Sequence, residues 1–222
     1  MIGSGIAASR LSPNDTGLQL FENAAATAAA LIAIILALGP VSGAHLNPVI
    51  TLVDWLLGGV RPAEALAYIG AQILGAILGV VVANLMFGLH AVQVSQTDRS
   101  GGGLWLGEVV ATLGLVLIVF GVVHSRRPSA APFAVGAYIA SAYFFTSSTS
   151  FANPAVTLAR TLSDTFAGIA PSSAPAFVIA EFVGCALGLV LIRFLYPGID
   201  RDAADTILAH PHDGDEDSPQ PG

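Results

Sequence analysis

The fold follows from two similar stretches of sequence, Ser42-Gly43-Ala44-His45-Leu46-Asn47-Pro48-Val49 and Thr149-Ser150-Phe151-Ala152-Asn153-Pro154-Ala155-Val156. Asn is a favoured N-cap and Pro a favoured first helical residue, so a helix is predicted to begin at each Asn-Pro pair. The two helices can cover about residues 47–57 and 153–163. At about 1.5 Å per residue, roughly ten residues span about half of the hydrocarbon core of a bilayer.

These stretches belong to a longer internal repeat. Asn47 and Asn153 stand 106 positions apart, and a second match, between residues 71–79 and 180–188, has an offset of 109. Two separate matches at nearly one offset indicate a duplication, with half-repeats at about 1–90 and 104–197. Residues 71–79 and 180–188 both carry glycines four positions apart, a spacing that lets helices approach closely in lipid.

The composition is that of a membrane protein. Of the 222 residues, 54% are hydrophobic and only 10% are charged, whereas soluble domains carry about 25% charged residues. Residues 1–197 are therefore predicted to form a transmembrane channel domain, and the acidic residues 198–222 a disordered cytoplasmic tail. Five stretches are long and apolar enough to be predicted as spans: 17–39, 63–88, 105–124, 132–149 and 175–196.

The polar residues exclude several classes of function. The eight basic residues are all arginine and are scattered, so no nucleic-acid partner is expected. No nucleophile–base arrangement or metal-ligand cluster is visible, and we expect neither an enzyme nor a metal or cofactor. If the spans alternate, five arginines share the side that the positive-inside tendency places in the cytoplasm, together with the C-terminus: Arg61, Arg126, Arg127, Arg193 and Arg201.

The two short helices suggest how a solute could cross. If each half has an odd number of full spans, the halves insert with opposite topology and the short helices meet N-terminus to N-terminus at the midplane. Their positive dipole ends oppose cations and protons, while the Asn amides can donate hydrogen bonds to a neutral solute. Non-helical backbone is tolerated at this depth where it lines a water-filled path. Five loop residues are predicted to turn carbonyl groups toward that path: Gly43, Ala44, His45, Thr149 and Phe151.

These motifs resemble the aquaporin, or major intrinsic protein, family, whose hallmark is a pair of Asn-Pro-Ala motifs. The matching residues are Asn47, Pro48, Val49, Asn153, Pro154 and Ala155, and Glu108-Val109-Val110-Ala111-Thr112-Leu113 is similar to the signature that opens the family's second half. The resemblance implies an all-α membrane protein, a right-handed bundle of two inverted repeats with two half-helices meeting at the midplane. It also implies a passive channel, a homotetramer with one pore per protomer, and a multi-pass location in the cell (inner) membrane.

The departures from the family bear on selectivity. Val156 stands where the family usually has the arginine of its outer constriction. By the family's spacing, the other constriction residues fall on Thr27, Ser141 and Ser150, with Ala142, Tyr143 and Phe151 as competitors within a residue or two. Such a filter implies a wider and less cationic path, suited to water, glycerol, urea and neutral arsenite. Residues 149–160 are also similar to a bacterial subgroup associated with arsenic resistance, which implies arsenite or methylated arsenicals as candidate cargo.

Three further polar residues carry expectations. The resemblance makes Glu108 a structural acceptor that braces the non-helical loop, and His45 a brace of the first loop. Arg160 lies one turn beyond Val156 on the same helix face. It either contributes to exclusion at the outer mouth or neutralises the end of the half-helix and meets headgroups; we favour the second role.

Rival readings remain open at this stage. A proton-coupled secondary carrier would use Glu108 or Glu181, because carboxylates within membrane spans often carry coupled protons. The family has six full spans, and residues 1–8 are too short to be the first, so that span is expected to be truncated. A misplaced start or a fragment would explain this, and a non-conducting fragment that associates with a partner is the second rival.

Overall fold

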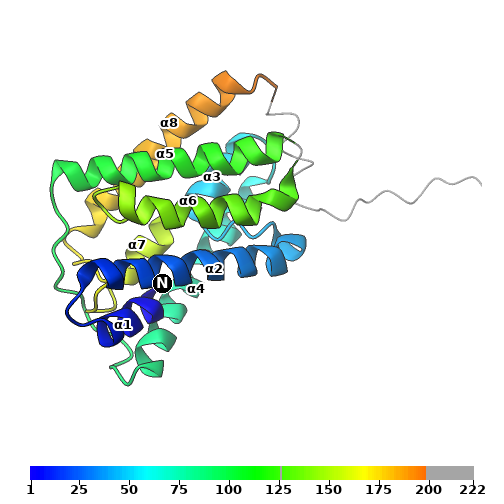
Figure 1. The fold of residues 1–222 in the computed structure, drawn as a ribbon. Helices are drawn as coiled ribbons and strands as arrows, with labels where there is room; N and C mark the ends of the chain where they lie inside the picture. Colours follow the sequence, from blue (N-terminus) through cyan, green and yellow to red (C-terminus); the bar gives the residue numbers. More distant parts are fainter. Residues whose placement is uncertain (126, 199–222) are drawn as a thin grey trace, which may run out of the picture.

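The computed structural model describes residues 1–125 and 127–198, which form a bundle of helices without strands (Figure 1). The predicted all-α fold is therefore confirmed for these residues, whereas the predicted tail, apart from residue 198, lies outside them, as do Arg126 and Arg201. In chain order, the elements are α1 (Ile2–Leu11), α2 (Thr16–Ser42), α3 (Pro48–Leu56), α4 (Pro62–Met86), α5 (Gly102–His124), the 3₁₀ turn η1 (Pro128–Ala130), α6 (Ala131–Phe145), α7 (Pro154–Arg160) and α8 (Ala174–Leu195).

Four of the described helices, α2, α4, α5 and α8, are long and apolar enough to cross a membrane. The fifth predicted span, 132–149, corresponds to α6, which has 15 residues and ends at Phe145. Its last predicted residues leave the helix because Thr146 takes an extended conformation and Thr149 a left-handed one. These residues instead begin the loop that leads to α7.

The long helices pack in two pairs, α5 with α8 and α2 with α6, and α5 also packs on α6 (Figure 1). Glycines allow the close contacts. A Cβ at Gly184 of α8 would lie 2.5 Å from the Val109 carbonyl oxygen of α5, and one at Gly136 of α6 would lie 2.6 Å from the Ile32 side chain of α2. The bundle interior between these pairs is filled by apolar side chains from both halves, including Val49, Val116, Phe120, Tyr143 and Ile192.

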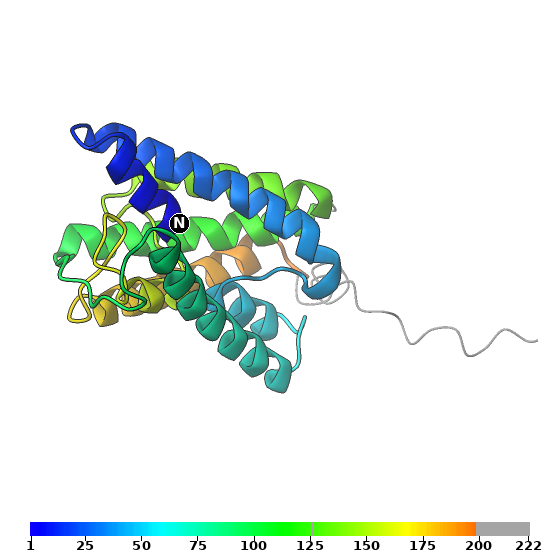
Figure 2. The same cartoon turned by 90° about the horizontal axis from the view of Figure 1, so that it is seen from below.

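The two short helices, α3 and α7, lie inside the bundle. α3 packs on α4, α5 and α8, while α7 packs on α4 and α8, and the two also contact each other. Each begins as predicted, with Asn as N-cap and Pro as first residue, but they end earlier than expected, after 9 and 7 residues. α1 runs beside α2 and against α4, as Figure 2 shows from below.

The glycine spacing has different outcomes in the two halves. Gly184 and Gly188 give the close approach of α8 to α5 that was predicted. The same prediction for Gly75 and Gly79 of α4 is not confirmed. Among the described residues, nothing lies within 4 Å of a Cβ added at either position, because α4 meets α1, α3 and α7 through its other faces.

This contrast gives a stability test. We expect Gly184→Val to destabilise the protein by about 1–3 kcal/mol, because the new side chain would overlap the α5 backbone. The repeat counterpart Gly75→Val is the matched control, since it adds the same side chain to a membrane helix in open space. The apparent midpoint of thermal unfolding in detergent should fall for the first variant only, and equal losses would contradict the α5–α8 packing.

Candidate functional site

The loops before α3 and α7 have unusual backbone conformations at matching positions. Ala44 and Leu46 have φ values of 46° and 52°, and their repeat counterparts Ser150 and Ala152 have 52° and 48°. Thr149, the counterpart of Gly43, is also left-handed. For a residue with a Cβ, this region costs on the order of 1–3 kcal/mol and persists only when its surroundings hold it.

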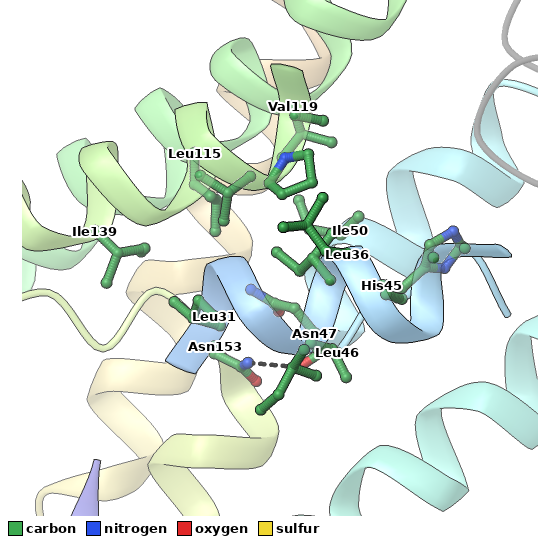
Figure 3. Close-up of a pocket in the computed structure, with 18 of the residues that line it drawn as sticks. Leu31, Leu36, His45, Leu46, Asn47, Ile50, Leu115, Val119, Ile139 and Asn153 are labelled. Atoms are coloured by element: carbon green, nitrogen blue, oxygen red, sulfur yellow. Dashed lines mark hydrogen bonds between the residues drawn. The ribbon is translucent and has the colours of Figure 1, made fainter. Parts of the chain in front are cut away.

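The two asparagines hold these loops reciprocally. Asn47 Nδ2 donates to the Ala152 carbonyl at 2.7 Å, and Asn153 Nδ2 donates to the Leu46 carbonyl at 2.8 Å, the bond drawn in Figure 3. The side-chain oxygens face the other way and accept from the first backbone amides of their own helices, at 3.0 Å for Asn47 and 3.1 Å for Asn153. An amide nitrogen carries two N–H groups, so each Asn can still donate once to a solute.

Both asparagines face a cavity of about 670 Å³ (Figure 3). Most of its wall is apolar, from side chains such as Leu31, Ile50 and Leu115. The polar groups are gathered near the half-helix N-termini. Of the predicted site residues, the cavity brings together Thr27, Gly43, Ala44, His45, Asn47, Phe151, Asn153 and Val156. Within residues 1–125 and 127–198, no three His, Cys, Asp or Glu side chains are grouped so that they could hold a metal ion.

The predicted constriction is only partly assembled. The Tyr143 hydroxyl donates to Thr27 Oγ1 at 3.4 Å, and Val156 lines the cavity. Ser141 is a wrong assignment: it lies on the exposed face of α6 and donates to the Ala137 carbonyl at 2.8 Å. Its competitor Tyr143 lies on the buried face of α6, because two residues on a helix rotate a side chain by about 200°.

Ser150 is fully buried, and its hydroxyl oxygen has no hydrogen-bond partner among the described residues. A buried polar group without a partner is uncommon and calls for a physical reason. Ser150 is not among the residues that line the cavity, so this hydroxyl lies behind the cavity wall formed by its neighbours Phe151 and Ala152.

Carboxylates brace the second loop. Glu108 Oε1 accepts from Phe151 N at 2.9 Å and its Oε2 from Ala152 N at 2.7 Å, which is the structural contact expected of it. Glu181 was not expected to join it, yet its Oε1 accepts from Asn153 N at 3.2 Å and from the Thr157 hydroxyl at 2.6 Å.

The first loop is braced by neutral groups at corresponding positions. Gln72, the repeat counterpart of Glu181, donates to the Thr51 hydroxyl at 2.9 Å. The ring of His45 lies with Nδ1 at 3.1 Å from the same hydroxyl and Nε2 at 3.5 Å from Asp54. The repeat offset makes Gln72 equivalent to Glu181 and Thr51 equivalent to Thr157, so one of these contacts predicts the other.

Arg160 departs from the role we favoured for it. The side chain is only 3% exposed, so it does not meet headgroups. Its Nε donates to the Ala167 carbonyl, and its guanidinium carbon lies 3.3 Å from the centre of the Phe151 ring. Its Nη1 is 3.4 Å from the sulfur of Met1.

The connection between the halves adds a second arginine that sequence reasoning missed. Residues 93–97 pair through backbone hydrogen bonds with residues 161–170, and Arg99 Nε donates to the Gly168 carbonyl at 2.8 Å. The Arg99 guanidinium carbon lies 5.3 Å from the Phe151 ring centre. Hydrogen bonds from Ser173 and Ser100 fix the neighbouring Asp98 and lower its pKa below the usual value. No local pattern distinguishes Arg99 from an ordinary loop arginine.

Comparison with known proteins gives one consistent result. The sequence matches the family described as Major intrinsic protein over residues 1–150. It is 46% identical to Aquaglyceroporin AqpS of Rhizobium meliloti over 195 residues, which cover 88% of this chain and 83% of that protein. It is 32% identical to a probable aquaporin, AqpM, of Archaeoglobus fulgidus, with 77% and 74% covered. It is 31% identical to Aquaporin Z of Bradyrhizobium diazoefficiens, with 81% and 80% covered.

The carboxylate brace can be tested by one substitution. We expect Glu108→Gln to destabilise the protein by about 1–3 kcal/mol, because an amide can accept only one of the two buried N–H bonds and turns its NH₂ toward the other donor. Thermal unfolding in detergent would measure this loss. Glu64→Gln, in the exposed first turn of α4, is the control and should leave the midpoint unchanged. A wild-type midpoint for Glu108→Gln would remove Glu108 from the brace.

Proposed function

Because the chain belongs to the major intrinsic protein family, we propose that it is a passive transmembrane channel for small uncharged solutes, namely water, glycerol and urea. In this proposal, solutes move down their own gradients, without a cofactor and without coupling to protons. The paired half-helices oppose the passage of ions.

The observation that carries this proposal is the meeting of two half-helix N-termini at one cavity. Each terminus bears about half a positive elementary charge, so the pair disfavours cations and protons. Asn47 and Asn153, which cap these helices, each retain an N–H that can donate to a neutral oxygen. A hydroxyl compound that gives up water on entry therefore finds donors from the asparagines, and acceptors in the loop carbonyls.

The composition of the constriction supports solutes larger than water. Thr27, whose hydroxyl accepts from the buried Tyr143, gives the cavity wall a hydroxyl group, and Val156 gives it an aliphatic side chain in place of a long cation. The printed name of the relative from Rhizobium meliloti, an aquaglyceroporin, favours glycerol. Residues 149–160 motivate the further proposal that arsenite, as neutral As(OH)₃, and methylated arsenicals are also conducted.

The rival carrier finds less support in the geometry. Three of the four carboxylate oxygens of Glu108 and Glu181 are taken up in bonds to the loop and to Thr157. A carrier that loaded and released protons there would break the bonds that hold the strained loop. We therefore assign both residues a positioning role.

We further propose the family's assembly, a homotetramer with one pore per protomer, in the cell (inner) membrane with the C-terminus in the cytoplasm. Large apolar side chains on the outer faces of α2, α4 and α8 remain exposed in the single chain and suit both lipid and neighbouring protomers.

Swelling of proteoliposomes tests the function. In gradients of glycerol and of As(OH)₃, we expect uptake that does not saturate with concentration and does not change when a proton gradient is imposed. Empty liposomes and liposomes that contain an unrelated membrane protein give the background. Saturable uptake that needs a proton gradient would support the carrier, and no uptake of any neutral solute would support a non-conducting fragment.

A single substitution tests the width of the path. We expect Val156→Arg to reduce glycerol and As(OH)₃ uptake by about tenfold or more, while water permeability falls much less, because a long cation would narrow the cavity beside Thr27. Val156→Thr, of nearly equal volume, is the matched control and should keep both fluxes. Equal losses of water and glycerol in Val156→Arg would indicate a damaged protein rather than a narrower filter.

A further inference from the structure

We propose that Arg160 guards the outer end of the path against cations, one helical turn beyond the position of the constriction residue Val156. This inference rests on the proposed channel function and adds a specificity-determining residue to it. Three observations carry it: the helical register of Arg160, the residues that its guanidinium touches, and the groups that hold it in place.

The register places Arg160 on the side of α7 that faces the cavity. Val156 lines the cavity, and Arg160 follows it by four residues, hence on the same face of the helix. Helical side chains lean toward the N-terminus of their helix, so the guanidinium reaches back toward Val156 rather than outward.

The contacts of the guanidinium agree with this register. Phe151 and Met1 both line the cavity, and these are the two side chains that Arg160 touches, at 3.3 Å from the Phe151 ring centre and 3.4 Å from the Met1 sulfur. The cation therefore lies directly behind the part of the cavity wall that Phe151 and Met1 form.

The site fixes the guanidinium in place without a direct contact to a carboxylate among the described residues. The Ala167 carbonyl accepts from Nε, and the ring face of Phe151 stabilises the cation. Among the described residues, the groups in direct contact with it are a carbonyl, a ring and a thioether, while the buried carboxylates of Glu108 and Glu181 act on it electrostatically from further away. Since the side chain is only 3% exposed, water screens its field poorly. Arg99 adds a second guanidinium near the same ring.

The repeat makes this guard one-sided. The counterpart of Arg160, 106 positions earlier, is Asp54, which is also fully buried and lies 3.5 Å from His45. One half-helix therefore ends in a buried base and the other in a buried acid. At this pair of repeat positions a cation therefore meets a like charge at the α7 end and an opposite charge at the α3 end, whereas a neutral solute is indifferent to both.

The test compares charge with size at this one position. Arg160→Met and Arg160→Gln remove the charge, Arg160→Lys keeps it, and Arg10→Met removes an exposed arginine of α1 as the matched control. Each protein is reconstituted into liposomes that carry either a pH dye or a Na⁺-sensitive dye, and proton and Na⁺ entry are driven by a K⁺ diffusion potential. Glycerol swelling is measured on the same vesicles.

We expect the two neutral variants to raise proton or Na⁺ leak by about tenfold or more while keeping glycerol uptake within about twofold. Arg160→Lys and Arg10→Met should leak like the wild type. Unchanged leak in either neutral variant that still conducts glycerol would overturn the proposal. So would misfolding of both neutral variants with Arg160→Lys intact, because Arg160 would then only hold the loop.

The experiment distinguishes failure of the proposed channel function from failure of the proposed role of Arg160. If the wild type conducts no neutral solute, the proposed channel fails, whatever the leak of the variants. If the wild type conducts glycerol and the leak is independent of the charge at position 160, only the guard fails.

Discussion

Non-helical backbone at membrane depth must find its hydrogen-bond partners within the protein, because lipid offers none. The loops before α3 and α7 satisfy this constraint reciprocally. The Asn side chain of each half donates a hydrogen bond to a loop carbonyl of the other half. Left-handed residues aim those carbonyls, and the buried acceptors Glu108 and Glu181 bind the amides of the second loop. The packing of the long helices around this centre serves to keep the two loops face to face.

In the proposed channel, the same contacts divide the selection of solutes among different groups. Helix dipoles act at the centre of the path, where both half-helices begin. The hydroxyls of Thr27 and Tyr143 lie together beside the apolar Val156, and the charge of Arg160 lies beyond them. An arginine placed in the narrowest part would both repel cations and narrow the path. Placing the charge one turn away separates these two effects, so that a wide constriction and exclusion of cations can coexist.

Sequence reasoning succeeded where a feature depends on local chemistry. The starts of α3 and α7 follow from capping by Asn and Pro, and the long helices follow from apolar length. It failed where a feature depends on rotation about a helix or on a distant neighbour. Ser141 was chosen by counting across a loop, and an error of two residues turned the side chain to the opposite face of α6. The burial of Arg160 depends on contacts with Ala167 and Phe151. The open space beside Gly75 depends on which faces of α4 pack against other helices. A local sequence pattern predicts neither.

The exchange between the asparagines also has a consequence for biosynthesis. A ribosome completes Asn47 and its loop 106 residues before Asn153. At about 5–20 residues per second, the first half waits on the order of 5–20 s for the partner of its Leu46 carbonyl. Until then the first half-helix has its contacts with α4 but lacks those with α5, α7 and α8, so it reaches its final position only after translation of the second half. Insertion of this chain is therefore not a series of independent steps, one for each helix.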